Sequence, residues 1–166
     1  MNFKNIMILK NWNYILFLIS IISLSFALIA EHYFKIQPCD LCLKQRHPYY
    51  IFLIIFFILL FTSNFYKIWL FILVQFVTLY GLFYSIWHVG IENKLLKAPS
   101  VCSTGLLQSS NVADLKEQIL AKKIIPCDEV IWSFFGISAA TINSMVLLFI
   151  FLINAIYILK FYGEKK

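Results

Sequence analysis

The chain has 166 residues, of which 61% are hydrophobic and only 13% are charged, and its formal net charge is +6. A soluble domain of this size needs more polar surface than this composition supplies, so a soluble fold is excluded and a membrane protein is expected. The positive charge forms no compact basic patch along the sequence, and no nucleic-acid partner is expected.

Apolar stretches separated by charged or Pro-containing segments predict an all-α bundle of four transmembrane helices. The helices are expected at about 12–30, 45–64, 68–89 and 132–159, within a single integral membrane domain covering 1–166. The first stretch has an alternative, a signal peptide, because Lys4 and Lys10 precede it and a small-x-small site ends at Ala27. Its length favours a membrane span over the apolar core of a signal peptide.

The second apolar stretch, Tyr49 to Ser63, is short for a membrane span. As a helix it rises only about 22 Å, against a hydrocarbon core of roughly 30 Å. The span is therefore expected to begin near Gln45, which brings Arg46 to the membrane interface with Cys42 one turn beyond. The cysteine motif is thus expected at the membrane surface.

Two loops, a short one at about 31–44 and a long one at about 90–131, contain all four cysteines. Basic residues are more numerous in these loops, but those on the side of the two termini lie closer to the helix ends, which favours cytoplasmic termini. Paired cysteines are expected in an oxidising compartment. Both observations predict that the cysteine-containing loops lie on the outer, periplasmic side.

Cys39 and Cys42 form a CxxC motif close to the start of the second helix. A thiolate near a helix N-terminus is stabilised by the backbone N–H groups and the helix dipole, so the motif favours redox activity. A static disulfide or half of a metal site are the alternatives. A four-cysteine zinc site would favour a second CxxC, whereas Cys102 and Cys127 are 25 residues apart. A c-type haem would need histidine where Leu43 stands, and no metal ion is expected.

Cys102 and Cys127 both lie in the long loop. A bridge between them could be a structural staple, worth roughly 3 kcal/mol. It could equally be an accessible disulfide that a thiol of another protein attacks.

A redox-active dithiol needs an electron acceptor. The chain has only five glycines and no GxGxxG pattern, so no nucleotide cofactor is expected, and a quinone dissolved in the membrane remains. A quinone needs an apolar slot and a few polar groups that hold its ring oxygens. Arg46 and His88 are the candidates, although an arginine at a helix end is often only an anchor and His88 could be an ordinary interfacial histidine.

Three segments resemble one family. Residues 38–50, PCDLCLKQRHPYY, resemble the PCxLCxxQRxPY signature of the DsbB family of disulfide bond formation proteins. Residues 88–92, HVGIE, are similar to the family's HxGxE. The segment from Cys127 to Asn143 is similar to its CDxxxW…GxS…N, and the three segments follow one another in the family's order.

The resemblance implies an enzyme of the bacterial inner membrane, a protein-dithiol:quinone oxidoreductase. It would reoxidise a DsbA-like periplasmic thioredoxin-fold partner and reduce ubiquinone or menaquinone from the membrane pool. Cys39 and Cys42 would be the quinone-proximal pair, Cys102 and Cys127 would meet the partner, and Arg46 and His88 would lie at the quinone site. The loop between Cys102 and Cys127 is shorter than in some members, which leaves partner docking open. An enzyme similar to vitamin K epoxide reductase and a non-catalytic, disulfide-stapled membrane adaptor are the alternatives.

Overall fold

The computed structural model describes residues 11–99, 127, 130, 132–134 and 136–163. The elements in chain order are α2 (Trp12–His32), α3 (Asp40–Phe61), α4 (Asn64–Glu92), β1 (Ser133–Phe134), β2 (Ile137–Ser138) and α6 (Ala139–Gly163). Within these described residues, four helices are long and apolar enough to cross a membrane. The expected fold class, an all-α bundle of four transmembrane helices, is therefore confirmed.

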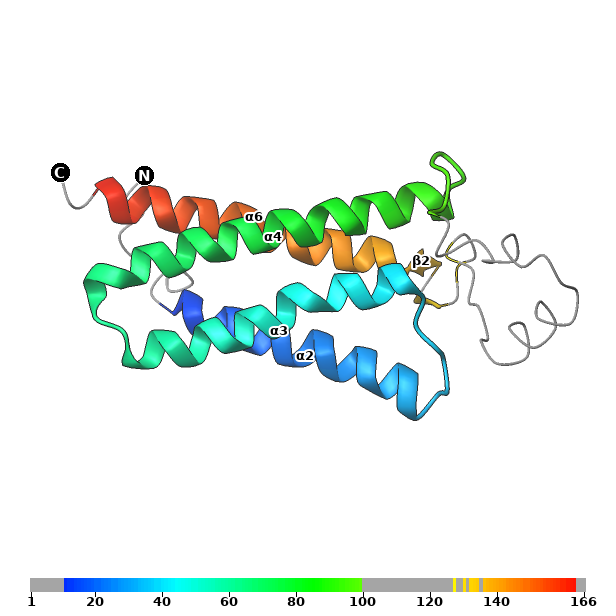
Figure 1. The fold of residues 1–166 in the computed structure, drawn as a ribbon, viewed down its shortest axis with the longest axis horizontal. Coiled ribbons are helices and arrows are strands. Elements are labelled where there is room, and N and C mark those ends of the chain that lie inside the picture. The colour runs from blue at the N-terminus through cyan, green and yellow to red at the C-terminus, as the bar shows by residue number, and fades with distance from the viewer. Residues whose placement is uncertain (1–10, 100–126, 128–129, 131, 135, 164–166) are drawn as a thin grey trace, which may run out of the picture.

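The helices run side by side along the long axis of the molecule (Figure 1). Helix α4 packs against α3 and α6, and α3 also packs against α2. The start of α2 and the end of α6 lie at one end of the bundle, whereas the start of α3, the end of α4 and the β1–β2 hairpin lie at the other. Residues from all three motif segments thus meet at one end.

Polar side chains join three helices near the opposite end. Trp12 Nε1 donates to Asn154 Oδ1 at 3.1 Å, and Asn154 Nδ2 donates to the carbonyl oxygen of Phe71 at 2.9 Å and to Gln75 Oε1 at 2.7 Å. Trp12 and Asn154 are fully buried. A buried polar group is costly unless it is hydrogen-bonded, so this network fixes how α2, α4 and α6 align.

Helix α3 begins at Asp40, earlier than the expected start near Gln45, so Cys42 lies inside the helix and not one turn beyond it. The reason is local. Cys39 is the N-cap residue, and its sulfur accepts a hydrogen bond from the backbone N–H of Cys42 at 3.1 Å. Asp40 also places a negative charge in the first turn, which favours a helix start.

Helix α6 begins at Ala139, later than the start near 132 that the apolar pattern suggested. Strands β1 and β2 occupy part of this segment and pair antiparallel, with Ser133 opposite Ser138. Gly136, between the strands, has a φ of +79°, a conformation that glycine adopts at no steric cost. The hairpin therefore replaces the first turns of the expected helix.

Gly81 marks a close approach of three helices. A Cβ atom at this position would lie 2.6 Å from Pro48 Cγ and 3.0 Å from Leu147 Cδ1. We expect Gly81→Val to destabilise the bundle by at least about 1–3 kcal/mol, because overpacking forces helices apart. The measurement is thermal unfolding of the purified protein. Leu79→Val places the same side chain on the exposed side of α4 and should unfold near the wild-type temperature; equal midpoints for both variants would contradict the predicted close packing.

Candidate functional site

The CxxC pair lies at the N-terminus of α3 with both cysteines as free thiols. Cys39 is almost fully buried, whereas Cys42 is half-buried. The hydrogen bond with Cys42 and then burial raise the pKa of the Cys39 thiol above its ordinary value. Cys39 therefore holds its proton more tightly than an exposed thiol would.

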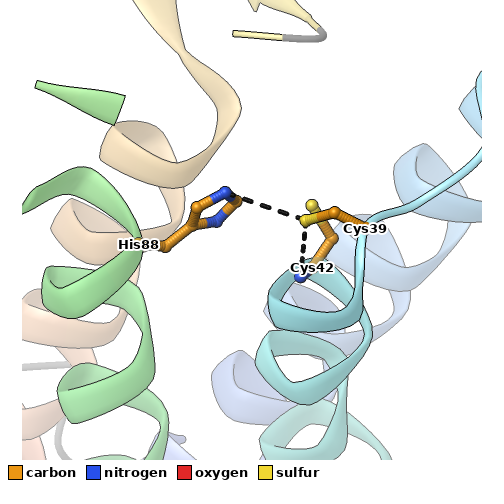
Figure 2. Close-up of side chains that lie close together, drawn as sticks. All are labelled: Cys39, Cys42 and His88. Atoms are coloured by element: carbon orange, nitrogen blue, oxygen red, sulfur yellow. Dashed lines mark hydrogen bonds between the residues drawn. The ribbon is translucent and has the colours of Figure 1, made fainter. Parts of the chain in front are cut away.

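His88, on the last turns of α4, points toward the cysteine pair (Figure 2). Its Nε2 atom lies 3.7 Å from Cys39 Sγ. Its other ring nitrogen, Nδ1, contacts the side-chain amide of Gln45 at 2.9 Å. From the sequence, His88 was a candidate for binding a quinone ring or an ordinary interfacial histidine, and the structure adds a direct contact with Cys39.

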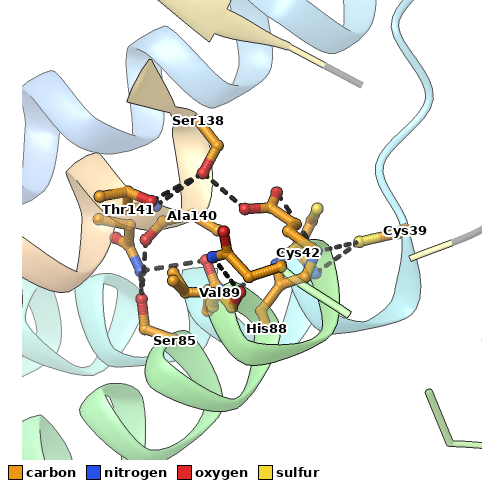
Figure 3. Close-up of polar contacts among 12 residues, drawn as sticks. Cys39, Cys42, Ser85, His88, Val89, Ser138, Ala140 and Thr141 are labelled. Carbon is orange, nitrogen blue, oxygen red and sulfur yellow. Dashed lines mark hydrogen bonds and ion pairs between the residues drawn. The ribbon is translucent and has the colours of Figure 1, made fainter. Parts of the chain in front are cut away.

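Hydrogen bonds extend from His88 into the bundle (Figure 3). Asn143 Nδ2 donates to Gln45 Oε1 at 3.2 Å, and the hydroxyl of Tyr49 donates to Asn143 Oδ1 at 2.6 Å. Among the described residues, no buried side-chain nitrogen or oxygen lacks a hydrogen-bond partner. The network therefore holds the His88 ring in one orientation.

Glu92, one turn after His88 on α4, brings a carboxylate that is only 8% exposed toward the cysteine pair, and it was not among the residues predicted from the sequence. Its Oε1 atom lies 3.9 Å from His88 Nε2, and its Oε2 atom accepts a hydrogen bond from Ser138 Oγ at 2.6 Å. Ser138 Oγ in turn lies 2.9 Å from Thr141 Oγ1 (Figure 3). The β1–β2 hairpin thus positions this carboxylate, and the glutamate of the HVGIE segment was the available signal.

Arg46 is directed toward α2. Its Nη1 atom donates to Glu31 Oε2 in an ion pair, and its Nη2 atom donates to the carbonyl oxygen of Ala27 at 3.4 Å. Only 13% of the Arg46 side chain is exposed. An arginine that merely anchors a helix end keeps its charged head in water, so this burial favours a role inside the protein. Glu31 was not predicted, because the pairing depends on how α2 and α3 pack.

A cavity of about 410 Å³ extends from the cysteine end of the bundle between α2 and α6. Cys42 lines it, whereas Cys39 is absent from its lining. Such an apolar slot with a few convergent polar groups fits a quinone, the cofactor that the sequence suggested. The polar lining residues include Cys42, Gln45, Arg46, His88 and Glu92, and the apolar ones include Ile22, Phe26, Ala30, Trp132, Ile142 and Val146.

Cys127 is fully buried and disulfide-bonded. It belongs to the same small cluster of buried side chains as Cys39, Leu41 and Ile91. The structure therefore brings Cys127 to the CxxC pair, although the two segments are far apart in the sequence. Cys102 lies outside the described residues, and its pairing with Cys127 stays a prediction.

The chain is similar to known proteins along most of its length. A family model described as disulfide bond formation protein DsbB matches residues 10–157. A protein of Rickettsia prowazekii (strain Madrid E), described as the uncharacterized protein RP370, is 30% identical over 159 residues, which cover 95% of this chain and 91% of that protein. No solved structure matches the chain significantly.

Proposed function

The chain belongs to the DsbB family of disulfide bond formation proteins, and from this premise we propose that it transfers electrons from a DsbA-like periplasmic dithiol protein to a membrane quinone. It is a multi-pass membrane protein with a role in disulfide bond formation. The observation that carries the proposal is the cavity between α2 and α6. Its lining is mostly apolar and includes both Cys42 and Arg46.

The partner side of the reaction requires disulfide exchange. A thiolate of the partner attacks the bridge that we expect between Cys102 and Cys127, and the partner's second thiolate displaces the mixed disulfide, which oxidises the partner and leaves the outer pair reduced. A thiolate of the outer pair then attacks the inner disulfide of Cys39 and Cys42, so that the outer bridge forms again and the inner pair is left as two thiols. The packing of Cys127 with Cys39 in one buried cluster supports exchange between the two pairs. A DsbA-like partner is a strong oxidant at about −120 mV, so its reoxidation requires an acceptor at least as oxidising, such as a respiratory quinone pool.

The inner pair then forms its disulfide again. A bound ubiquinone or menaquinone supplies an acceptor for two electrons and two protons. Cys42 faces the cavity, and Cys39 lies beside it, ready to close the disulfide. Since Cys39 is buried from water, the neighbouring His88 ring is placed to stabilise its thiolate: Gln45 donates to Nδ1, which leaves the N–H on Nε2, 3.7 Å from the sulfur. Closing the sulfur–sulfur bond releases two electrons and the two thiol protons.

Arg46 provides the test of the quinone site. A planar guanidinium can direct donors at a ring oxygen that becomes negative on reduction, whereas lysine is a compact and strongly hydrated point charge. We therefore expect Arg46→Lys to raise the KM for quinone and Arg46→Met to raise it further, by about tenfold or more, because a hydrogen bond to a charged group contributes about 1.5–3 kcal/mol. The measurement is steady-state quinone reduction over a range of quinone concentrations with reduced partner saturating.

A neighbouring basic residue gives the control. Lys44 is on the same helix and pairs with Asp40 at 3.0 Å, but it does not line the cavity. Lys44→Met removes the same charge and should leave the KM unchanged. Unchanged KM and kcat in Arg46→Met, with expression and cysteine pairing preserved, would return Arg46 to the role of a helix anchor.

A further inference from the structure

We propose that the dithiol form of the CxxC pair, together with His88, binds one thiophilic divalent cation such as Zn²⁺. The sulfur atoms of Cys39 and Cys42 and a ring nitrogen of His88 all lie within 4.8 Å of one another. Among the residues that the structure describes, this is the single group of three or more Cys, His, Asp or Glu side chains with such spacing. Figure 2 shows all three side chains directed toward one another.

The spacing matches tetrahedral zinc coordination. Zinc binds cysteine sulfur at about 2.3 Å and histidine nitrogen at about 2.0–2.1 Å, so a tetrahedral site separates these two atoms by about 3.6 Å. Cys39 Sγ and His88 Nε2 are 3.7 Å apart without any ion. An ion could therefore bind with little rearrangement of α3 relative to α4.

The surroundings of His88 suit a ligand histidine. A metal-binding histidine normally donates its other ring N–H to an acceptor. Here the Gln45 amide lies 2.9 Å from Nδ1 with its nitrogen toward the ring, and Nε2 faces the sulfurs. Binding of an ion at Nε2 would therefore move the ring proton to Nδ1 and turn the Gln45 amide so that its oxygen accepts from Nδ1–H. Glu92 Oε1 lies 3.9 Å from Nε2 and brings a negative charge close to the ion. The three protein ligands leave a fourth position for water, as in open zinc sites.

The chemistry makes this site dependent on the redox state. Two thiolates and an imidazole select soft or borderline ions such as Zn²⁺ and Cd²⁺. Binding displaces the protons that the two thiols still hold, so each ion bound releases up to two protons, depending on pH. The disulfide form has no thiolates and offers no site. An ion on the dithiol occupies the sulfurs that must otherwise close the disulfide, so, given the proposed function, Zn²⁺ would inhibit turnover when the dithiol form accumulates.

The binding test needs neither quinone nor partner. The Cys102→Ser/Cys127→Ser variant keeps only the CxxC thiols, and wild type is measured beside it in case the variant folds poorly. Each protein is reduced anaerobically and titrated with Co²⁺ while thiolate-to-cobalt absorption and proton release are recorded; Zn²⁺ is then added as a competitor. We expect the variant to bind one ion, to release up to two protons per ion as the pH falls, and to bind none after oxidation to the disulfide.

Two histidine variants separate the three-ligand site from simple chelation by the two sulfurs. His88→Ala should weaken binding by at least about tenfold, because even residues that only support a ligand contribute 10- to 100-fold. His88→Gln, which retains a polar side chain, should do the same if the alanine variant folds poorly. His47, an exposed histidine on α3, is the control, and His47→Ala should bind as wild type does.

The outcomes are distinct. Unchanged affinity in the His88 variants, binding that survives Cys42→Ser, or the absence of thiolate-to-cobalt absorption would each overturn the metal site. None of these results would alter quinone reduction by the metal-free protein, so the site can fail while the proposed function stands. If the site binds, addition of Zn²⁺ during turnover should slow quinone reduction, and a chelator should restore the rate.

Discussion

Replacement of Cys39 or Cys42 by serine is expected to lower quinone reduction at least about a thousandfold, to the background rate, because a protein that has lost one partner of a reacting unit loses nearly all of its activity. Cys42 lines the cavity, and Cys39 lies beside it without lining the cavity. The two sulfurs therefore have different positions, but neither can form the disulfide alone. The measurement is the absorbance change of quinone with reduced partner as electron donor.

Leu43→Ser is the matched control for the cysteine variants. It places the same serine between the cysteine motif and Arg46, at a position that is exposed. This variant should reduce quinone at close to the wild-type rate. Near-normal turnover by Cys39→Ser would remove the CxxC pair from the electron path.

The Cys102→Ser and Cys127→Ser variants should show a different defect. Each leaves Cys39 and Cys42 intact but removes the bridge that the partner is expected to attack. We therefore expect oxidation of the partner to fall at least about a hundredfold, while a small dithiol still reduces quinone through the inner pair. Both rates can be measured on the same preparation with the two reductants in turn.

Burial of Cys127 calls for one further variant. Its side chain is fully buried beside Cys39, so a serine hydroxyl there could disturb packing on its own. Cys127→Ala avoids this and should separate the two activities in the same way. If all these variants oxidise the partner at the normal rate, the outer pair is only a structural staple.

The number and approximate extent of the helices could be predicted, because the hydrocarbon core of a membrane imposes long apolar stretches. Helix ends could not be predicted as well, because local contacts determine them. The sulfur of Cys39 caps α3, so the helix begins at Asp40. A hydropathy pattern contains no information about such a hydrogen bond. The segment before Ala139 is apolar enough to be taken for helix, but the backbone at Gly136 turns it into a hairpin.

The candidate site, too, could be predicted only in part from the sequence. The cysteines, Arg46 and His88 were selected from their chemistry and spacing, and the structure brings Cys39, Cys42 and His88 together. Glu31 and Glu92 were missed for different reasons. Glu31 pairs with Arg46 across α2 and α3, and no local pattern connects these segments. Glu92 lies one turn after His88 in the HVGIE segment, but its hydrogen bond with the hairpin that precedes α6 depends on packing.

Anaerobic titration of the purified protein with reduced partner and a defined quinone tests electron transfer from dithiol to quinone most directly. We predict that one quinol forms for each partner disulfide formed, and that Cys42→Ser abolishes quinol formation while leaving the fold intact. The cysteines of the wild-type protein should pass through the reduced state and return to disulfides. Partner that stays reduced, with no quinol formed and with the cysteine pairs unchanged throughout, would contradict electron transfer through this chain and would indicate a membrane protein whose disulfides are only structural.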